Sequence, residues 1–409
     1  MNANNYKNDS LIKYSAILSS VILFNYLLWS LSAWQIIREV NFIFLLLTTI
    51  FFFVSRKYND YWDVKIIILI LLMVCLGSPT IDADSRSLYL FSSKMLYYES
   101  NLYFRLDSNN SMVNYFNDIV YSKPKLSIAL TATFAQLVGY WNEIYPKSTN
   151  TIIILPPIIF LISFFKDRIF TLVWLFLMLF FSGRLLINGL MDGIIALYFV
   201  SCTLISYKIL TTKKESEKLL FYLTLFIFFT ILSLTKNEGG VMVLVIFLSS
   251  FLIDFIYERK VNIKLFFTTL IALCPIGLWK YMFIKDNIKM EFLHNGDPIS
   301  KFLSRITNSE DLINIISFLA SNEKLLISIL IFTFVSYKFF SDNKKLIFFI
   351  SLNFLLYFSA LIVAVLLTPH TVQIQLIHSS SRIFIPLVLM LSYFSVFLFY
   401  KNLKKNKNN

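Results

Sequence analysis

The chain has 409 residues, of which 57% are hydrophobic and 17% aromatic, but only 15% are charged. Soluble domains carry about 25% charged residues, so this composition excludes a soluble domain and predicts an all-α polytopic membrane protein. The net charge of +13 is expected to reflect basic residues at the inner membrane face. Nucleic-acid binding is not expected, because no basic helix or RNA-binding sheet pattern is present. The three cysteines lie in apolar segments without metal-ligand spacing.

Apolar runs recur along the chain and predict about twelve membrane-spanning helices, several of them shorter than the ~20 residues of a full crossing. They cover residues 11–33, 40–54, 66–77, 151–165, 169–182, 185–209, 219–235, 240–257, 263–283, 324–339, 346–367 and 383–400. With both termini in the cytoplasm, more than half of the lysines and arginines fall on inner segments, as the positive-inside rule expects. Three regions follow: N-terminal transmembrane helices (1–77), an outer-face catalytic loop with surface helices (78–150), and a transmembrane bundle (151–409) with a second outer loop at about 285–323.

The polar interruption after the third span carries the first candidate residues. Asp82 and Asp84 stand two positions apart and are followed by Arg86 and Lys94. An Asp beside an acceptor hydroxyl can take its proton, and ionisable groups near the membrane interior are costly to keep without a function. A structural alternative is equally open. Either carboxylate could cap a helix over 85–98, or Asp82 could pair with Arg86 one turn later.

Lys123 and Lys125 stand just before an apolar run at 126–141. The spans on either side of this region both have their neighbouring ends at the outer face, so the run cannot cross the membrane. We therefore expect an interfacial helix that lies along the outer surface, with Tyr140 and Trp141 at the level of the lipid headgroups.

Two further motifs lie at outer ends of predicted spans. Asn188 and Asp192 are four residues apart, which predicts one helical face and either a substrate contact or a polar clamp between helices. Lys236 and Glu238 precede two glycines between apolar runs. This pattern predicts a tight turn, whose charges could equally form a surface ion pair of little energetic value.

His378 and Arg382 open the last span and are also four residues apart, so they are expected to point the same way. A guanidinium at the membrane surface suits a lipid phosphate, although an arginine that simply reaches the interface is the plainer alternative. The second outer loop has apolar residues at helical spacing and is expected to form helices that could cover the first loop. No Walker loop, zinc motif or catalytic-serine motif is present.

The order of these motifs resembles the polytopic glycosyltransferases of the GT-C superfamily. The motifs are Asp84-Ser85-Arg86-Ser87, Lys94, Lys123-Pro124-Lys125-Leu126, Asp192, Lys236-Asn237-Glu238-Gly239 and Ser381-Arg382. The resemblance implies a GT-C-like bundle, with Asp84 as catalytic base and Asp82 as the substitute candidate. It also implies substrate or lipid-phosphate binding by Arg86, Lys94, Lys123, Lys125, Asp192, Lys236, Glu238, His378 and Arg382. The chain departs from the family in reading Lys-Pro-Lys instead of Pro-Pro-Leu, and in having two spans before the usual first one.

The resulting hypothesis is a glycosyltransferase at the periplasmic face of a bacterial inner membrane. It would transfer a sugar from a polyprenyl-phosphate carrier to a lipid-linked or cell-surface glycan. The pattern requires no cofactor. Asp82 and Asp84 could hold a divalent cation, but their spacing does not require one. The alternative is a transporter or flippase of lipid-linked oligosaccharide, which would need charges along a path through the bundle and an internal repeat. A third reading is a structural partner in an envelope complex.

Overall fold

The computed structural model describes residues 3–55, 58, 61–77, 80, 84–102, 123–165, 167–259, 261–285, 297–368, 371–379 and 382–408. Within these ranges the chain is helical, with no β-strand. The first half contains α1 (Ala3–Ser30), α2 (Gln35–Val54), α3 (Trp62–Gly77), the π-helix η2 (Ser85–Leu90), α4 (Phe91–Glu99), α6 (Leu126–Val138), the 3-10 helix η3 (Pro146–Ser148), α7 (Thr149–Ile162), α8 (Arg168–Ile187) and α9 (Asp192–Thr211).

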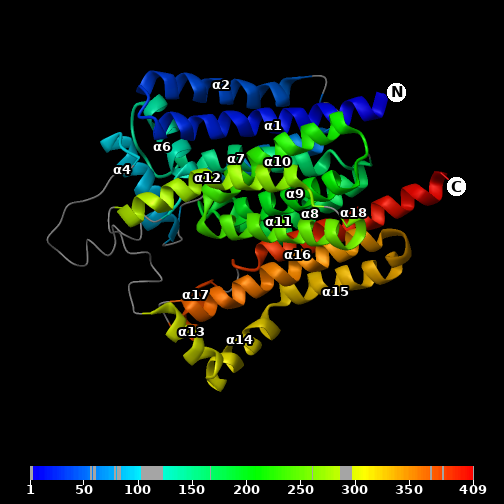
Figure 1. The fold of residues 1–409 in the computed structure, drawn as a ribbon. Helices are drawn as coiled ribbons and strands as arrows, with labels where there is room; N and C mark the ends of the chain where they lie inside the picture. Colours follow the sequence, from blue (N-terminus) through cyan, green and yellow to red (C-terminus); the bar gives the residue numbers. More distant parts are fainter. Residues whose placement is uncertain are drawn as a thin grey trace.

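The second half contains α10 (Glu215–Thr235), α11 (Asn237–Glu258), α12 (Ile263–Lys285), α13 (Pro298–Ile306), α14 (Ser309–Ser321), α15 (Glu323–Lys338), α16 (Phe340–Leu367), α17 (Val372–Ser379) and α18 (Ile385–Asn408). Most of the long helices run roughly parallel or antiparallel to one another, and both chain termini lie at the same end of the bundle (Figure 1). The turn between α8 and α9, the turn between α10 and α11, and the start of α18 lie towards the opposite end.

Among the described residues, nine helices are long and apolar enough to cross a membrane, or ten if the bent pair α14–α15 forms one span. This confirms a polytopic helical membrane protein. The predicted spans at 66–77, 151–165 and 324–339 are also helical, but α3, α7 and α15 have only 16, 14 and 16 residues. Twelve crossings therefore stay a prediction.

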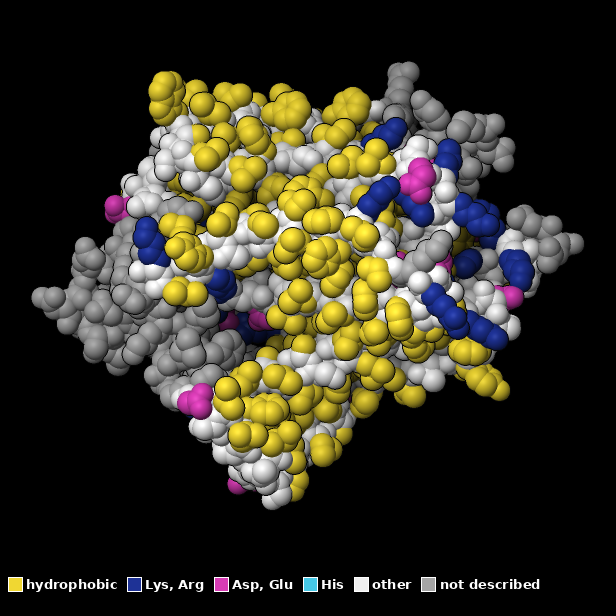
Figure 2. Space-filling view, in the orientation of Figure 1, with side chains coloured by type: hydrophobic (Ala, Val, Ile, Leu, Met, Phe, Trp, Pro, Cys, Tyr) yellow, Lys and Arg dark blue, Asp and Glu magenta, His cyan; other side chains and the backbone are white. Residues whose placement is uncertain are grey.

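The helices divide into central and peripheral ones. In the most apolar 18-residue stretches of α9 and α18, 94% and 83% of the residues are buried inside the protein. The corresponding values for α2 and α12 are only 28% and 22%. Figure 2 shows the apolar side chains of the outer helices as a broad band across the molecule. Many of the lysines and arginines gather at the end where the termini lie, which agrees with the orientation predicted from the sequence.

The apolar run after Pro124 forms a helix, but its surroundings differ from the prediction. α6 begins at Leu126 and ends before Gly139, and most of its residues are buried, including Thr131, Thr133 and Gln136. It packs against α1, α2, α4 and α7. An interfacial helix would keep one exposed apolar face for lipid, so the expectation of a surface helix is wrong for this segment.

The second outer loop forms two helices, as its periodicity predicts. Asp297 caps α13 by accepting hydrogen bonds from the backbone N–H groups of Ile299 and Ser300, and Asn308 caps α14 in the same way at Glu310. α13 packs on α16, and α14 packs on α17. Residues 103–122 of the first outer loop are outside the described residues, so the expected covering of that part of the loop stays a prediction.

Candidate active site

An ion pair between the start of η2 and the turn before α18 joins two motifs that are 298 positions apart. The Nη2 of Arg382 lies 2.6 Å from a carboxylate oxygen of Asp84. Asp84 stands at the N-terminus of η2, yet its side chain makes no capping hydrogen bond. The side chain of Asp84 therefore does not cap the helix, as one alternative had it. Arg382 is likewise not an isolated arginine at the membrane interface, because it is paired with Asp84. π-Helical segments often occur at functional sites.

A second ion-pair group lies where α9, α10 and α11 meet. The ammonium of Lys236 lies 2.9 Å from Asp192 and 3.0 Å from Glu238. The Asp192 side chain is 5% exposed and that of Lys236 is 17% exposed, whereas that of Glu238 is 41% exposed. Lys236 is thus only partly exposed and is paired on one side with a buried carboxylate, so the alternative of a fully solvated turn with a surface pair does not apply.

The two neighbouring carboxylates favour the charged form of Lys236. Burial by itself would lower the pKa of the Lys236 ammonium, but the carboxylates of Asp192 and Glu238 outweigh burial and hold that pKa well above its ordinary value. Asp192 of α9 thus forms an ion pair with Lys236 at the start of α11, which is the polar clamp between helices that the sequence analysis gave as one of two alternatives. Glu238 is the partner that also faces solvent.

The two ion-pair groups form one cluster. The charge of Arg382 acts on Asp192, and the buried phenol of Tyr89 lies within the electrostatic reach of Asp84, Asp192 and Lys236. Burial raises the pKa of Tyr89, which keeps this phenol neutral. In the view of Figure 2, acidic and basic side chains also lie together in a recess away from the termini.

The link between α8 and α9 differs from the sequence prediction. Asn188 follows the end of α8 and Asp192 begins α9, so the two do not share a helical face. Gly189 turns the chain between them with φ of +87°, a conformation that L side chains rarely adopt. A Cβ on Gly189 would contact Ser85 and the buried Lys147, so this turn packs directly beside η2.

Lys123 contributes positive charge beside the cluster, and Lys125 lies within its electrostatic reach. Lys123 acts electrostatically on Glu238, on Lys125 and on Lys280 of α12. Burial and the neighbouring charge of Lys123 lower the pKa of Lys125 to about 7. Lys280 belongs to this basic group, but no pattern in the sequence distinguishes it from the other lysines at span ends.

The remaining predicted residues are less closely connected to the cluster. Arg86 and Lys94 are exposed. His378 lies in α17 and Arg382 lies in the turn before α18, but the side chain of His378 is outside the described part of the chain, so their expected shared face stays a prediction. Asp82 lies outside the described residues.

No group of three or more His, Cys, Asp or Glu side chains within the described ranges has a geometry suited to a metal ion. The acids of the cluster are instead matched by Arg382 and Lys236. This arrangement offers a solvent-accessible carboxylate next to fixed positive charges. Such a site can accept a proton and can bind an anion.

No family model, curated protein or solved structure matches the chain. The fold and the site together define a polytopic helical membrane protein with an ion-pair cluster near the end of the bundle opposite the termini.

Proposed function

We propose that this chain is a membrane glycosyltransferase of the GT-C type. It takes a sugar from a polyprenyl-phosphate carrier and transfers it to a lipid-linked or cell-surface glycan. The site faces the periplasm of a bacterial inner membrane. The observation that carries the proposal is the pairing of the partly exposed Asp84 carboxylate with Arg382, in one cluster with the ion pair of Lys236 and the buried Asp192.

In the proposed reaction, an acceptor hydroxyl attacks the anomeric carbon of the donor sugar while its proton passes to the Asp84 carboxylate. The bond between that carbon and the phosphate oxygen breaks, and the polyprenyl phosphate departs with the bonding electrons. Arg382 contacts the proposed base directly and is suited to hold the leaving phosphate, because its guanidinium can bind two phosphate oxygens at once. Lys236 adds a fixed positive charge next to it.

The two acids of the cluster are suited to different roles. Asp84 is 43% exposed and can reach a substrate, whereas Asp192 is almost completely buried against Lys236. A general base must lie within hydrogen-bond reach of the proton that it abstracts. The exposure of Asp84 supports it as the base, whereas Asp192 contacts Lys236 and is suited to hold it in position.

The proposal is tested by the glycan composition of the envelope of source cells with and without this chain. Removal is expected to eliminate one sugar, and the wild-type chain should restore it. The Asp84→Asn variant should be made at a normal level without restoring the sugar. The matched control is Lys214→Met, which removes a charge from an exposed pair near the other end of the bundle; it should restore the sugar fully.

Full restoration by Asp84→Asn would remove Asp84 from the mechanism. A second measurement uses the purified chain in lipid vesicles with labelled polyprenyl-phosphate sugar. Movement of this lipid between leaflets without formation of a glycosylated product would replace the transferase proposal with the flippase alternative.

A further inference from the structure

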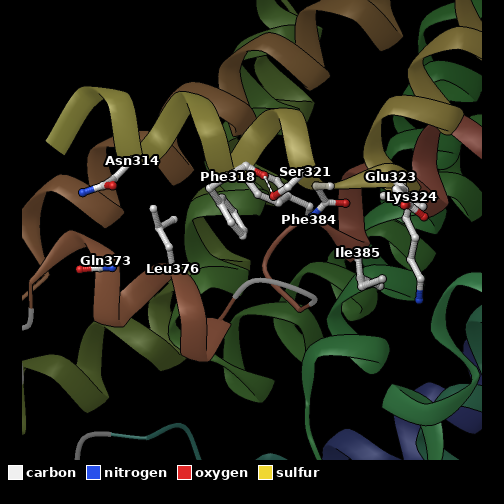
Figure 3. Close-up of a pocket in the computed structure, with 11 residues that line it drawn as sticks. Asn314, Phe318, Ser321, Glu323, Lys324, Gln373, Leu376, Phe384 and Ile385 are labelled. Carbon is white, nitrogen blue, oxygen red and sulfur yellow. Dashed lines mark hydrogen bonds between the residues drawn. The ribbon is translucent and has the colours of Figure 1, made fainter. Parts of the chain in front are cut away.

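A cavity of about 600 Å³ lies between the α14–α15 pair and the α17–α18 segment (Figure 3). The wall formed by α14 and α15 is bent, because the two helices meet at 66°. Asn322 stabilises the bend by accepting a hydrogen bond from the backbone N–H of Leu325. A cavity of this volume falls in the range of small-molecule binding sites, which hold about 300–1,000 Å³.

The cavity combines polar side chains with stacked aromatic rings. The rings of Phe318 and Phe384 lie 5.7 Å apart at an angle of 30°, and Figure 3 shows Phe318 extending from α14 towards the opposite wall. The polar side chains of the lining are Asn314, Ser321, Asn322, Glu323, Lys324 and Gln373.

This lining fits a carbohydrate better than a lipid tail. Each sugar hydroxyl needs both a hydrogen-bond donor and an acceptor, and amide side chains such as Asn314 and Gln373 supply both. The apolar C–H face of a pyranose can pack against an aromatic ring such as Phe318. A polyprenyl chain would satisfy none of the polar groups and would remove them from water at a cost.

The cavity is connected to the ion-pair cluster through a short turn. Phe384 and Ile385 line the cavity, and the backbone N–H of Ile385 donates to the carbonyl of Arg382 over 3.1 Å. The side chain of Arg382 in turn binds Asp84. The wall of the cavity therefore begins immediately after the arginine of the proposed reaction centre.

We infer that this cavity is the subsite for the terminal sugars of the glycan acceptor. The inference rests on the proposed transferase function and adds the location and the chemical class of the second substrate. Amides and Phe318 hold the sugar rings, and the reactive hydroxyl extends along the turn at Arg382 towards Asp84.

The test is protection of introduced cysteines from a maleimide reagent in purified protein in lipid nanodiscs. Cys274 is the exposed native cysteine and is first replaced by serine, whereas the buried Cys75 and Cys202 stay. Ser321→Cys and Gln373→Cys place a thiol in the cavity lining in two independent variants. The matched control is Ser304→Cys, an exposed position on α13 outside the lining.

The probes are soluble mono- and disaccharides of hexose, N-acetylhexosamine and deoxyhexose type, and separately a short-chain polyprenyl phosphate. A saccharide at about ten times its Kd should slow labelling of both cavity cysteines about tenfold, because mass action leaves about a tenth of the sites empty. Labelling of Ser304→Cys should not change. If no saccharide protects either thiol at about 50 mM, well above a weak millimolar Kd, the inference is wrong. Protection by polyprenyl phosphate alone would likewise overturn it.

This measurement separates the two proposals because it needs no transferase activity. Loss of an envelope sugar on removal of the chain, without saccharide protection of the cysteines, would keep the transferase and reject the cavity as acceptor subsite. Saccharide protection together with an unchanged envelope glycan would reject the transferase and with it the acceptor role of the cavity.

Discussion

The most informative perturbation of the cluster is Lys236→Met, which removes the positive charge and keeps a side chain of similar length. In the wild-type protein this ammonium contacts Asp192 at 2.9 Å and Glu238 at 3.0 Å. Without it, the buried carboxylate of Asp192 loses the cation that it contacts directly, although the charge of Arg382 still acts on it. Breaking a buried pair by removing one partner costs about 3–5 kcal/mol, because the remaining charge has lost both water and its counter-ion.

The expected loss for Lys236→Met is about 3 kcal/mol, the lower end of that range, because Lys236 keeps some exposure at the end of the bundle. Lys214→Met is the control. Lys214 pairs with Glu217 at 3.0 Å, but these side chains are 56% and 45% exposed. Its removal should change the free energy of unfolding by less than about 1 kcal/mol.

The assay is reversible unfolding in mixed detergent and lipid micelles, followed by circular dichroism. The double variant Lys236→Met/Asp192→Asn should recover most of the lost stability, since no buried charge stays unpaired at Asp192. Glu238 is exposed enough to be solvated in both variants. If Lys236→Met is as stable as Lys214→Met, or if the double variant is no more stable than Lys236→Met, the assignment of a buried clamp is refuted.

Three other predictions follow from the same contacts. Asp84→Asn should lower sugar transfer by at least about 100-fold while changing the free energy of unfolding by less than about 1 kcal/mol, measured by product formation and by unfolding; a comparable loss of stability would make Asp84 structural. The pKa of Lys125 is lowered from 10.5 to about 7 in the folded protein. Between these two pH values Lys125 binds a proton in the unfolded chain but not in the folded one, so the free energy of unfolding should rise from about pH 7 to about pH 10. Lys125→Met should remove this rise, and an unchanged pH profile in that variant would contradict the prediction. A Cβ on Gly239 would meet the Leu232 carbonyl oxygen at 1.9 Å, whereas one on Gly240 would meet nothing within 4 Å; Gly239→Ala should therefore destabilise the protein, and Gly240→Ala should be neutral or stabilising by thermal unfolding.

The arrangement of distant motifs could be predicted from the sequence because membrane crossings alternate. Asp84, Asp192, Lys236 and Arg382 each stand at the end of an apolar run, and an orientation set by lysines and arginines assigns all these ends to one side. The contacts between them then require only that the helices pack into one bundle. The specific pairing, Arg382 with Asp84 and Lys236 with Asp192, depends on helix packing that no local pattern encodes.

The errors in the sequence prediction have a common physical cause. The hydropathy of a segment indicates that it avoids water. It does not show whether the segment is surrounded by lipid or by other helices of the protein. The run beginning at Leu126 is apolar with Thr131, Thr133 and Gln136 on several sides, and its polar side chains are buried. Helical spacing similarly suggested a shared face for Asn188 and Asp192, although Gly189 breaks the helix between them. A glycine in an apolar run does not show from the sequence alone whether the chain turns there.

The different exposure of the two pairs implies an order of events in the proposed reaction. Lys236 is held by Asp192 from within the bundle and can keep its position whether or not substrate is present. Arg382 is bound to Asp84 at a partly exposed site, so a lipid phosphate that reaches Arg382 competes directly with the Asp84 carboxylate. Displacement of Asp84 by the phosphate would release the base only after the donor has bound. The pair would thereby couple binding of the donor to activation of the acceptor hydroxyl, and the buried clamp would keep the local field constant throughout.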